Sequence, residues 1–310
     1  RPPRSTQSRS SAASDVYKRQ VPCLGITPIV EDGVIRSDGR TILGGDDTSG
    51  VAIMLELLAL LNERPARQAP PPLELVFTVR EEVGLGGSKG LDVGRLRARR
   101  AIVLDLGGPI GAICVQGPSQ NRLNVVVHGR KAHAGTSPEL GINAIRVAAE
   151  AIAAMPLGRI DPETTANIGV IHGGEATNIV PDRVELRGEA RSLYDDKLAR
   201  QTQAMVDALR EAAGRHGATL DLEVSESYRA FQIPGDASVV QELSAATRLC
   251  GLQPLWISTG GGSDANIFNQ RGIQAVAFST GMDKVHTTEE CIALSDMALC
   301  ADILARVVGL

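Results

Sequence analysis

Residues 183–224 read RVELRGEARSLYDDKLARQTQAMVDALREAAGRHGATLDLEV. This stretch predicts a strand over 183–192, a helix over 195–216 and a strand over 218–224. Three further elements are expected before it: a strand over 123–127, a helix over 139–155 and a strand over 165–171. The order strand–helix–strand–strand–helix–strand is the split βαβ arrangement of a ferredoxin-like domain. We therefore expect a ferredoxin-like α+β domain at residues 116–228.

Strands and helices alternate on both sides of this domain, which is typical of a layered α/β protein. The segment LELVFTV (residues 73–79) is almost continuously apolar, so we expect a strand buried on both faces. Ser295 is expected to cap the final helix. The remaining expected elements are helices over 50–62 and 237–249 and strands over 101–105, 255–258 and 274–279. These elements predict one discontinuous, layered α/β domain, built from residues 21–115 and 229–310.

Composition narrows the function classes. The net charge of −4 offers no basic face for nucleic acid, and no apolar run is long enough for a membrane span. The five cysteines are odd in number and scattered, which favours a reducing compartment, and we expect a cytoplasmic protein. The first twenty residues, rich in Arg and Ser and poor in large apolar residues, are expected to be a non-native or disordered leader. A transit peptide is the alternative for this leader.

Acidic residues recur where expected strands or turns end. They are Asp46, the pair Glu81-Glu82, and Asp105, and His286 lies in a similar loop near the end of the chain. Open α/β sheets place their ligand sites beyond the carboxyl ends of the strands. Crowded carboxylates repel one another and take up protons, and a divalent cation would remove that cost. Oxygen ligands combined with imidazole suit zinc, manganese or cobalt.

Glu81-Glu82 is the most informative dipeptide. Neighbouring side chains at the end of a strand can point in different directions, so one carboxylate can bind a metal while the other remains a general base. A solvated acidic turn is the alternative interpretation.

Seven blocks in order resemble a known group of enzymes. They are LGGDDTSG, TVREEVGLGGSKG, VLDLGG, GRKAHAGTSPELGINAI, ATNIVPDRVELRGEARS, GGGSDANIFNQRGI and VHTTEE. Together they resemble the dizinc metallopeptidase superfamily that holds peptidase T, carboxypeptidase G and the aminoacylases. The similarity runs from about Val21 to the end of the chain and is closest to peptidase T-like members.

The resemblance implies roles for the acidic residues. Asp46 would bridge two zinc ions, Glu82 and His286 would complete the ligands of one zinc, and Asp105 would bind the other. Glu81 would be the general base. Asp46 as a residue of a helix-capping turn and His286 as a surface histidine are the alternatives.

The resemblance also implies roles within the inserted domain. His133 would reach the active site of a partner subunit and stabilise the oxyanion or a substrate carboxylate. Arg191 would bind the substrate carboxylate through two parallel hydrogen bonds, and Asn178 would also bind substrate. The chain would then be a homodimer formed through the inserted dimerisation (lid) domain, and residues 21–115 and 229–310 would form a three-layer catalytic domain like that of the zinc exopeptidases.

Two departures from the superfamily pattern affect the expected activity. Thr48 stands where many members have lysine. The His-x-Asp metal block is expected shortly before Val21, whereas the first histidine here is His128. We therefore expect an N-terminally truncated, impaired enzyme that hydrolyses short peptides. An N-acyl amino acid deacylase or dipeptidase, and a non-catalytic descendant that binds peptide or metal, are the alternatives.

Overall fold

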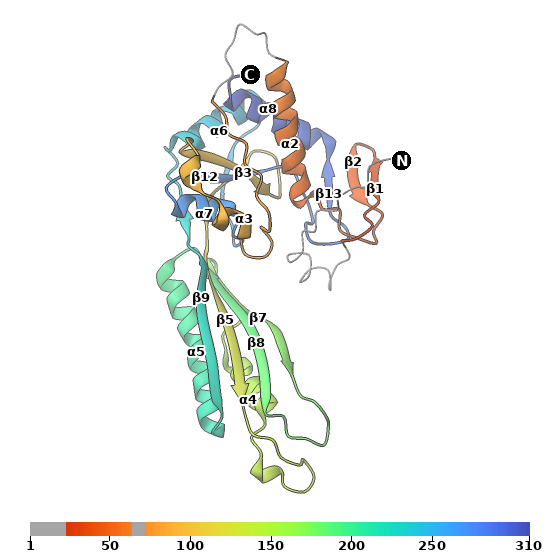
Figure 1. Cartoon of the computed structure of the whole chain (residues 1–310). Helices are drawn as coiled ribbons and strands as arrows, with labels where there is room; N and C mark the ends of the chain where they lie inside the picture. Colours follow the sequence, from red (N-terminus) through yellow and green to blue (C-terminus); the bar gives the residue numbers. More distant parts are fainter. Residues whose placement is uncertain (1–22, 64–71) are drawn as a thin grey trace. The chain divides into compact units, whose positions relative to one another are not determined.

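The computed structural model describes residues 23–63 and 72–310, which form two compact units (Figure 1). Unit 1 contains the described residues up to 116 together with 232–258 and 263–310, and unit 2 contains residues 117–231 and 259–262. The leader expected over the first twenty residues lies outside the described residues. No helix in the described part of the chain has the length and apolar character needed to cross a membrane.

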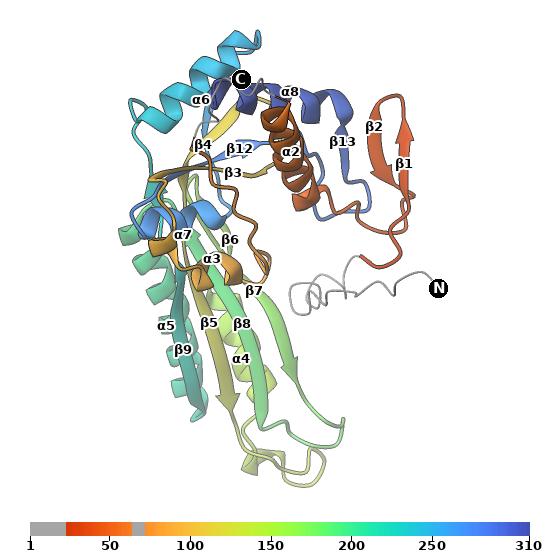
Figure 2. The ribbon, with the colours of Figure 1, turned by 45° about the horizontal axis from the view of Figure 1, so that its top comes forward.

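Unit 2 is an antiparallel sheet with two long helices. Its strands lie in the order β6-β7-β8-β5-β9 (Figure 2). The strands are β5 (Ser119–His128), β6 (Gly158–Asp161), β7 (Thr164–Gly173), β8 (Arg183–Ser192) and β9 (Thr219–Tyr228), and the helices are α4 (Ala144–Ala154) and α5 (Asp195–His216). The expected ferredoxin-like order is confirmed, with β6 as an additional edge strand that pairs with β7 and was not predicted.

The core of unit 2 follows from the period of two along β5. Leu123, Val125 and Val127 are almost fully buried and pack in one cluster with side chains of α4 and α5, including Val147 and Leu209. Successive side chains of a strand point to opposite faces, so these alternate apolar residues place both helices against the same face of the sheet.

The helix expected over 139–155 begins later than predicted. A short 3-10 turn, η2 (Pro138–Leu140), comes first, and α4 starts after Asn143, whose side chain accepts a hydrogen bond from Arg146 N at 3.0 Å. Gly141 separates the two, and a Cβ there would lie 2.9 Å from Val180 Cγ1. The extended backbone of Gly141 (φ −90°, ψ 162°) interrupts the helical pattern.

Unit 1 is built on a mixed sheet in the order β10-β4-β12-β3, with β11 beside β4. Its strands are β3 (Arg100–Leu106), β4 (Ala112–Gly117), β10 (Phe231–Gln232), β11 (Leu255–Ser258) and β12 (Gln274–Ser279). The helices are α2 (Gly45–Asn62), α3 (Gly86–Gly90), α6 (Ser238–Leu249), α7 (Asp264–Gln270) and α8 (Leu294–Val307), with one 3-10 turn, η1 (Val93–Arg95). Ile113, Val276 and Phe278 are fully buried at its centre.

A second, smaller sheet in unit 1 has the order β1-β2-β13. It consists of the hairpin β1 (Pro28–Glu31) and β2 (Val34–Ser37), with β13 (Cys291–Ala293) antiparallel to β2. This sheet joins the early part of unit 1 to the segment that leads from the 286–290 loop into α8. Sequence-distant parts of the chain are therefore hydrogen-bonded near the residues expected to bind metal.

The prediction of a strand over residues 73–79 is wrong. This segment forms no strand, and Phe77 and Val79 are 51% and 68% exposed. Apolar β-branched composition favours an extended backbone, but a strand also needs a hydrogen-bonding neighbour. The segment is instead held by a side chain: Glu74 Oε2 accepts hydrogen bonds from Arg97 N and Ala98 N at 2.9 and 2.8 Å.

The prediction that Ser295 caps the final helix is also wrong. The residue at the N-cap of α8 is Ala293, with no side-chain cap, and Ser295 lies inside the first turn. Because β13 leads directly into α8, Leu294 N instead donates a hydrogen bond to Gly33 O at 2.8 Å, which satisfies a backbone donor without a capping hydroxyl.

Candidate metal centre

Asp46, Glu82 and His286 converge within unit 1. One side-chain oxygen or nitrogen from each residue lies within 4.8 Å of the other two. His286 Nε2 is 2.9 Å from Asp46 Oδ2 and 3.0 Å from Glu82 Oε1. Two carboxylates thus face one imidazole from three separate segments of the chain.

The start of α2 positions Asp46. Asp46 and Asp47 have non-helical backbone angles, and the regular turns begin after them. Asp47 Oδ1 accepts a hydrogen bond from Gly50 N at 3.0 Å, as an N-cap side chain does, while the Thr48 hydroxyl donates to Gly44 O. The Asp46 side chain is therefore left for the centre, because Asp47 satisfies the helix.

Turns present the other two residues. The carbonyl of Glu81 accepts hydrogen bonds from Gly84 N and Leu85 N at 3.0 and 2.8 Å, which closes the turn that carries Glu82. His286 adopts a φ of 65°, in the left-handed region that residues other than glycine rarely occupy. Such backbone conformations persist where the surrounding structure enforces them, and they cluster at functional sites.

The remaining acidic residues raise the electrostatic cost of the centre. Burial, and then the negative charges of Glu82, Asp264 and Asp46, raise the pKa of Glu81 to about 8. Burial likewise raises the pKa of Asp47 to about 8. Burial and the nearby carboxylate of Asp46 raise the pKa of Asp105 well above its ordinary value.

His286 offsets part of this negative charge. Its hydrogen bonds to Asp46 and Glu82 raise the pKa of the imidazole to about 10. An imidazolium therefore stands between the two carboxylates at neutral pH. A divalent cation placed among the same atoms would supply the positive charge and displace the proton, because a ligating imidazole must be neutral. Two oxygen donors and one nitrogen donor fit zinc, manganese or cobalt.

His133 and Asn178 come together in unit 2. Ala134 N donates to Asn178 O at 2.9 Å, and His133 forms an isolated bridge with Ile179. His133 is exposed, and its Nδ1 accepts from Gly135 N at 3.1 Å. In the neutral ring the proton is then on Nε2, which makes this atom a donor.

Their two loops follow the ends of β5 and β7 and lie at the same end of the sheet (Figures 1 and 2). Gly117 and Phe231, where the chain enters and leaves unit 2, belong to the other end, where β5 begins and β9 finishes.

Arg191 lies apart from His133 and Asn178. In the sheet it is paired with Gln120 near the start of β5, whereas Arg183 is paired with His128 at the far end. At about 3.3 Å per residue along β8, roughly 26 Å separates Arg191 from Arg183. The Arg191 guanidinium donates to both carboxylate oxygens of Glu189, at 2.9 and 3.1 Å. The bidentate geometry expected for a substrate carboxylate is thus made with Glu189.

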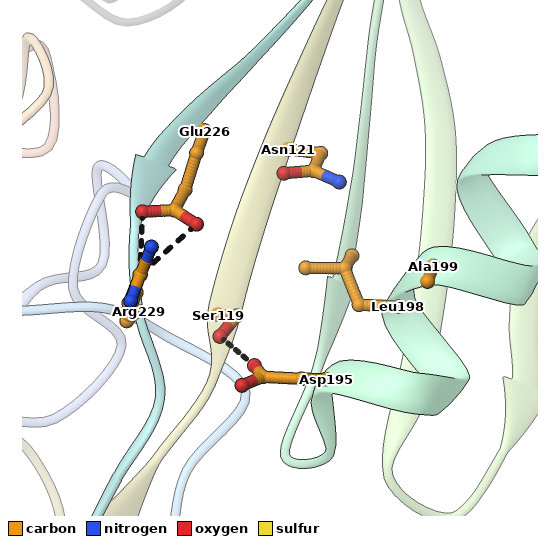
Figure 3. Close-up of a pocket in the computed structure, with 7 residues that line it drawn as sticks. All are labelled: Ser119, Asn121, Asp195, Leu198, Ala199, Glu226 and Arg229. Carbon is orange, nitrogen blue, oxygen red and sulfur yellow. Dashed lines mark hydrogen bonds and ion pairs between the residues drawn. The ribbon is translucent and has the colours of Figure 1, made fainter.

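A cavity of about 340 Å³ in unit 2 contains none of the expected site residues (Figure 3). Ser119 Oγ donates to Asp195 Oδ1 at 2.7 Å, and Arg229 Nε donates to Glu226 Oε1 at 2.9 Å across its wall. These groups satisfy one another, so the cavity shows no arrangement that assigns it a ligand.

Comparisons with known proteins agree with the geometry of the centre. Residues 120–217 match the peptidase dimerisation domain, and residues 26–120 match the M42 glutamyl aminopeptidase family. The Bacillus subtilis protein YqjE is 39% identical over 93% of this chain and 77% of its own length. The crystal structure of aminopeptidase PepT from Bacillus cereus is 42% identical, with a TM-score of 0.80 over 93% of this chain and 77% of its own. The chain belongs to the peptidase T-like metallopeptidase family.

Two further relatives support this assignment to the peptidase T-like family. A tripeptidase structure from Staphylococcus aureus is 39% identical, with a TM-score of 0.85 over 93% of this chain and 77% of its own. Peptidase T of Salmonella schwarzengrund is 29% identical over 89% of this chain and 68% of its own length. As a member of the family, the chain is a metal-dependent peptidase of the hydrolase class with a catalytic domain that carries an inserted dimerisation domain. Family membership implies a dinuclear metal site.

Glu290 was not among the expected site residues. Its carboxylate is buried and hydrogen-bonded to the backbone that leads into Asp46. Its place in VHTTEE, close to His286, was the only signal in the sequence.

Proposed function

We propose that this peptidase is a zinc-dependent aminopeptidase that releases the N-terminal residue of short peptides. The convergence of Asp46, Glu82 and His286, with Glu81 beside them, is the observation that carries the proposal. The names of the relatives, which include an aminopeptidase and a tripeptidase, support this substrate class.

The donor set divides between two metal positions. Asp46, Glu82 and His286 would hold one zinc ion, and Asp105 together with Asp46 would contribute to the other. Bound zinc supplies Lewis-acid polarisation of the scissile carbonyl. Manganese or cobalt would satisfy the same donors.

Glu81 would act as general base and general acid. Its carboxylate would accept a proton from the attacking water and return it to the leaving amine. Glu82 is not free for this role when it is a metal ligand. Glu82 would therefore bind metal, and the adjacent Glu81 would transfer the proton.

The inserted domain would complete the site through dimerisation. His133 would donate from Nε2 to the developing oxyanion in the site of a partner subunit, and Asn178, in the adjoining loop, would bind substrate. The position of both loops at the end of unit 2 remote from Gly117 and Phe231 supports a role toward a second copy. Arg191 would exchange its bond with Glu189 for one to the carboxylate of the peptide.

The reducing cytoplasm is the proposed compartment. All five cysteines lie in the described residues and form no disulfide, although Cys23, Cys250 and Cys291 are partly accessible. Such thiols persist where glutathione and thioredoxin keep cysteines reduced.

Metal analysis combined with peptide cleavage tests the proposal. The chain is loaded with zinc, manganese or cobalt and assayed with a tripeptide, a dipeptide and an N-acetyl amino acid, with Glu81→Gln as the control. Release of the first residue of the tripeptide by the wild-type chain alone is expected, at the reduced rate of an impaired enzyme. Preferential cleavage of the N-acetyl amino acid would establish the deacylase alternative. Metal binding with no cleavage of any substrate would identify a non-catalytic binding protein and overturn the aminopeptidase.

A further inference from the structure

The side chain of Glu290 is only 1% exposed, yet it is engaged at both oxygens. Its Oε2 accepts hydrogen bonds from Leu43 N and Gly44 N, each at 2.9 Å, and its Oε1 accepts from Asp46 N at 3.0 Å. Three backbone donors therefore surround one buried carboxylate. Hydrogen bonds to an ionised acceptor are stronger than those between neutral groups, so this arrangement fixes the backbone of residues 43–46.

The same loop supplies Glu290 and His286. The two residues are joined by residues 287–289, and Glu290 N donates to Thr287 O at 3.3 Å, which makes the connection a compact turn. Glu290 thus connects the loop that carries the imidazole to the loop that carries Asp46. The relative position of the His286 and Asp46 side chains therefore depends on the Glu290 carboxylate. The hydrogen bonds of that carboxylate go to backbone N–H groups and not to either side chain.

The glycines of the 43–46 loop fit around this carboxylate. Gly44 has a φ of 77°, which favours glycine, and it presents its N–H to Glu290. A Cβ on Gly45 would lie 3.1 Å from Glu290 Oε1, closer than ordinary packing. The two glycines therefore let the N–H groups of Leu43, Gly44 and Asp46 approach Glu290 without an intervening side chain.

We propose that Glu290 is a positioning residue for the metal centre. It is not a ligand, but by holding the backbone of Asp46 relative to His286 it sets the affinity and coordination geometry of the metal that Asp46, Glu82 and His286 bind. The proposal rests on the proposed function of these three residues as ligands.

Substitution by glutamine separates this role from simple packing. Glutamine has the shape of glutamate but only one acceptor oxygen, and its amide N–H₂ would face backbone donors. Glu289→Gln is the matched control, because Glu289 is the adjacent residue, is exposed and pairs with Lys284 at 2.8 Å. His286→Ala reports whether metal binds at this centre at all.

Cobalt binding is measured by chelator competition and by the visible d–d spectrum, and the fold by circular dichroism and melting in EDTA. Glu290→Gln is expected to weaken cobalt binding by about 10- to 100-fold and to alter the d–d bands, the size of effect seen when groups supporting ligands are removed. Glu289→Gln is expected to match the wild-type chain. Gly45→Ala, which crowds Glu290 Oε1, is expected to weaken binding in the same direction and serves if Glu290→Gln does not fold.

The outcomes separate the two proposals. The positioning role would be overturned if folded Glu290→Gln kept the wild-type cobalt affinity and d–d bands while His286→Ala abolished binding. If only Gly45→Ala folds, the same result for that variant would overturn it. In either case the metal centre would stand. Cobalt binding unaffected by His286→Ala, or absent from the wild-type chain, would overturn the metal centre and the role of Glu290 with it.

Discussion

His286 Nε2 lies 2.9 Å from Asp46 Oδ2, although the two residues belong to the two parts of the chain that flank unit 2. In the absence of metal this contact is an ion pair between an imidazolium and a carboxylate. With metal, the same atoms would become ligands. The fold thus brings the two side chains together, and a proton and a metal cation would compete for Nε2 of His286.

Replacing His286 by alanine removes the one nitrogen donor among Asp46, Glu82 and His286. We expect His286→Ala to bind zinc at least about 100-fold more weakly than the wild-type chain, because loss of a ligand should cost no less than loss of a supporting group. Isothermal titration with zinc measures this. His128→Ala is the control, since His128 is paired with Asp221 at 2.7 Å in unit 2 and should leave zinc affinity unchanged. Equal affinities for the two variants would refute the ligand assignment.

Glu81→Gln should separate proton transfer from metal binding. We expect kcat for a tripeptide to fall by about 10²- to 10⁴-fold, the usual contribution of a general base, with zinc affinity retained. Glu82→Gln should instead lose zinc affinity, because it alters a proposed ligand. Measuring metal content and kcat for both variants tests the division, and a Glu81→Gln chain with normal kcat would exclude Glu81 as the base.

The metal-free chain should lose stability as the pH rises. The pKa values of Asp47 and Glu81 are about 8 in the folded state and about 4 when unfolded, so between these values the folded chain binds more protons. The free energy of unfolding therefore falls as pH increases from about 4 through 8. His286, with a folded pKa of about 10 against about 6.5 unfolded, acts in the same direction and extends the loss toward pH 10.

Thermal melts in EDTA from pH 5 to 9 measure this dependence. Glu81→Gln removes one of the groups and should melt at a Tm that falls less steeply with pH. Saturating zinc should raise Tm most at high pH, because metal binds the deprotonated centre. A metal-free Tm that rises between pH 6 and 9 would contradict the crowding of carboxylates.

Mixing two inactive variants tests whether His133 acts across subunits. His133→Ala and Glu81→Ala dimers should each be inactive, whereas mixed dimers hold one site with both residues intact. After equal mixing and subunit exchange, we expect about a quarter of wild-type activity, because half of the dimers are mixed and each has one working site. Subunit exchange is checked with differently tagged chains. Exchange without recovery would place His133 in its own subunit's site or outside catalysis.

Arg191→Ala tests recognition of the peptide carboxylate. We expect KM for a tripeptide to rise by about 10- to 100-fold, as for a lost hydrogen bond to a charged group, with little change in kcat. A tripeptide amide, which has no carboxylate, should be cleaved equally by both proteins. Arg187→Ala, an exposed arginine on the same strand, is the control. Equal effects on the acid and the amide would assign Arg191 to the stability of β8 through Glu189.

Much of unit 2 could be predicted because its patterns are local and long. The helix expected over 195–216 has the bounds of α5, since its apolar face repeats over many turns and Gly217, with a φ of 67°, ends it. The strand expected over 183–192 has the bounds of β8. Periodicity of this length dominates over the choice of single residues.

Unit 1 was less predictable because its elements depend on partners. Residues 73–79 have the composition of a strand without its pairing, whereas β4, an apolar run with Ile113 and Cys114 fully buried, was not expected. Helix α7 also escaped prediction, although Ser263 and Asn266 form a capping box at its start. The Gly-rich stretch before Ser263 concealed that signal, and asparagine replaces the usual acid or glutamine.

The centre shows the same contrast between side-chain and backbone chemistry. Acids and a histidine at the ends of elements can be read as ligands from residue type alone. Glu290 binds the chain through N–H groups, which every residue except proline possesses, so no pattern of residue types marks its partners.

The short distance along the chain from His286 to Glu290 has a consequence for protein engineering. If a residue were inserted or deleted within 287–289, the His286 imidazole and the Glu290 carboxylate could not both keep their positions. One of them would have to move away from its partners. The number of residues between His286 and Glu290 is therefore as important for the metal centre as the identity of these two residues. Libraries that aim to change substrate preference should vary the exposed side chains of this segment and hold its length constant.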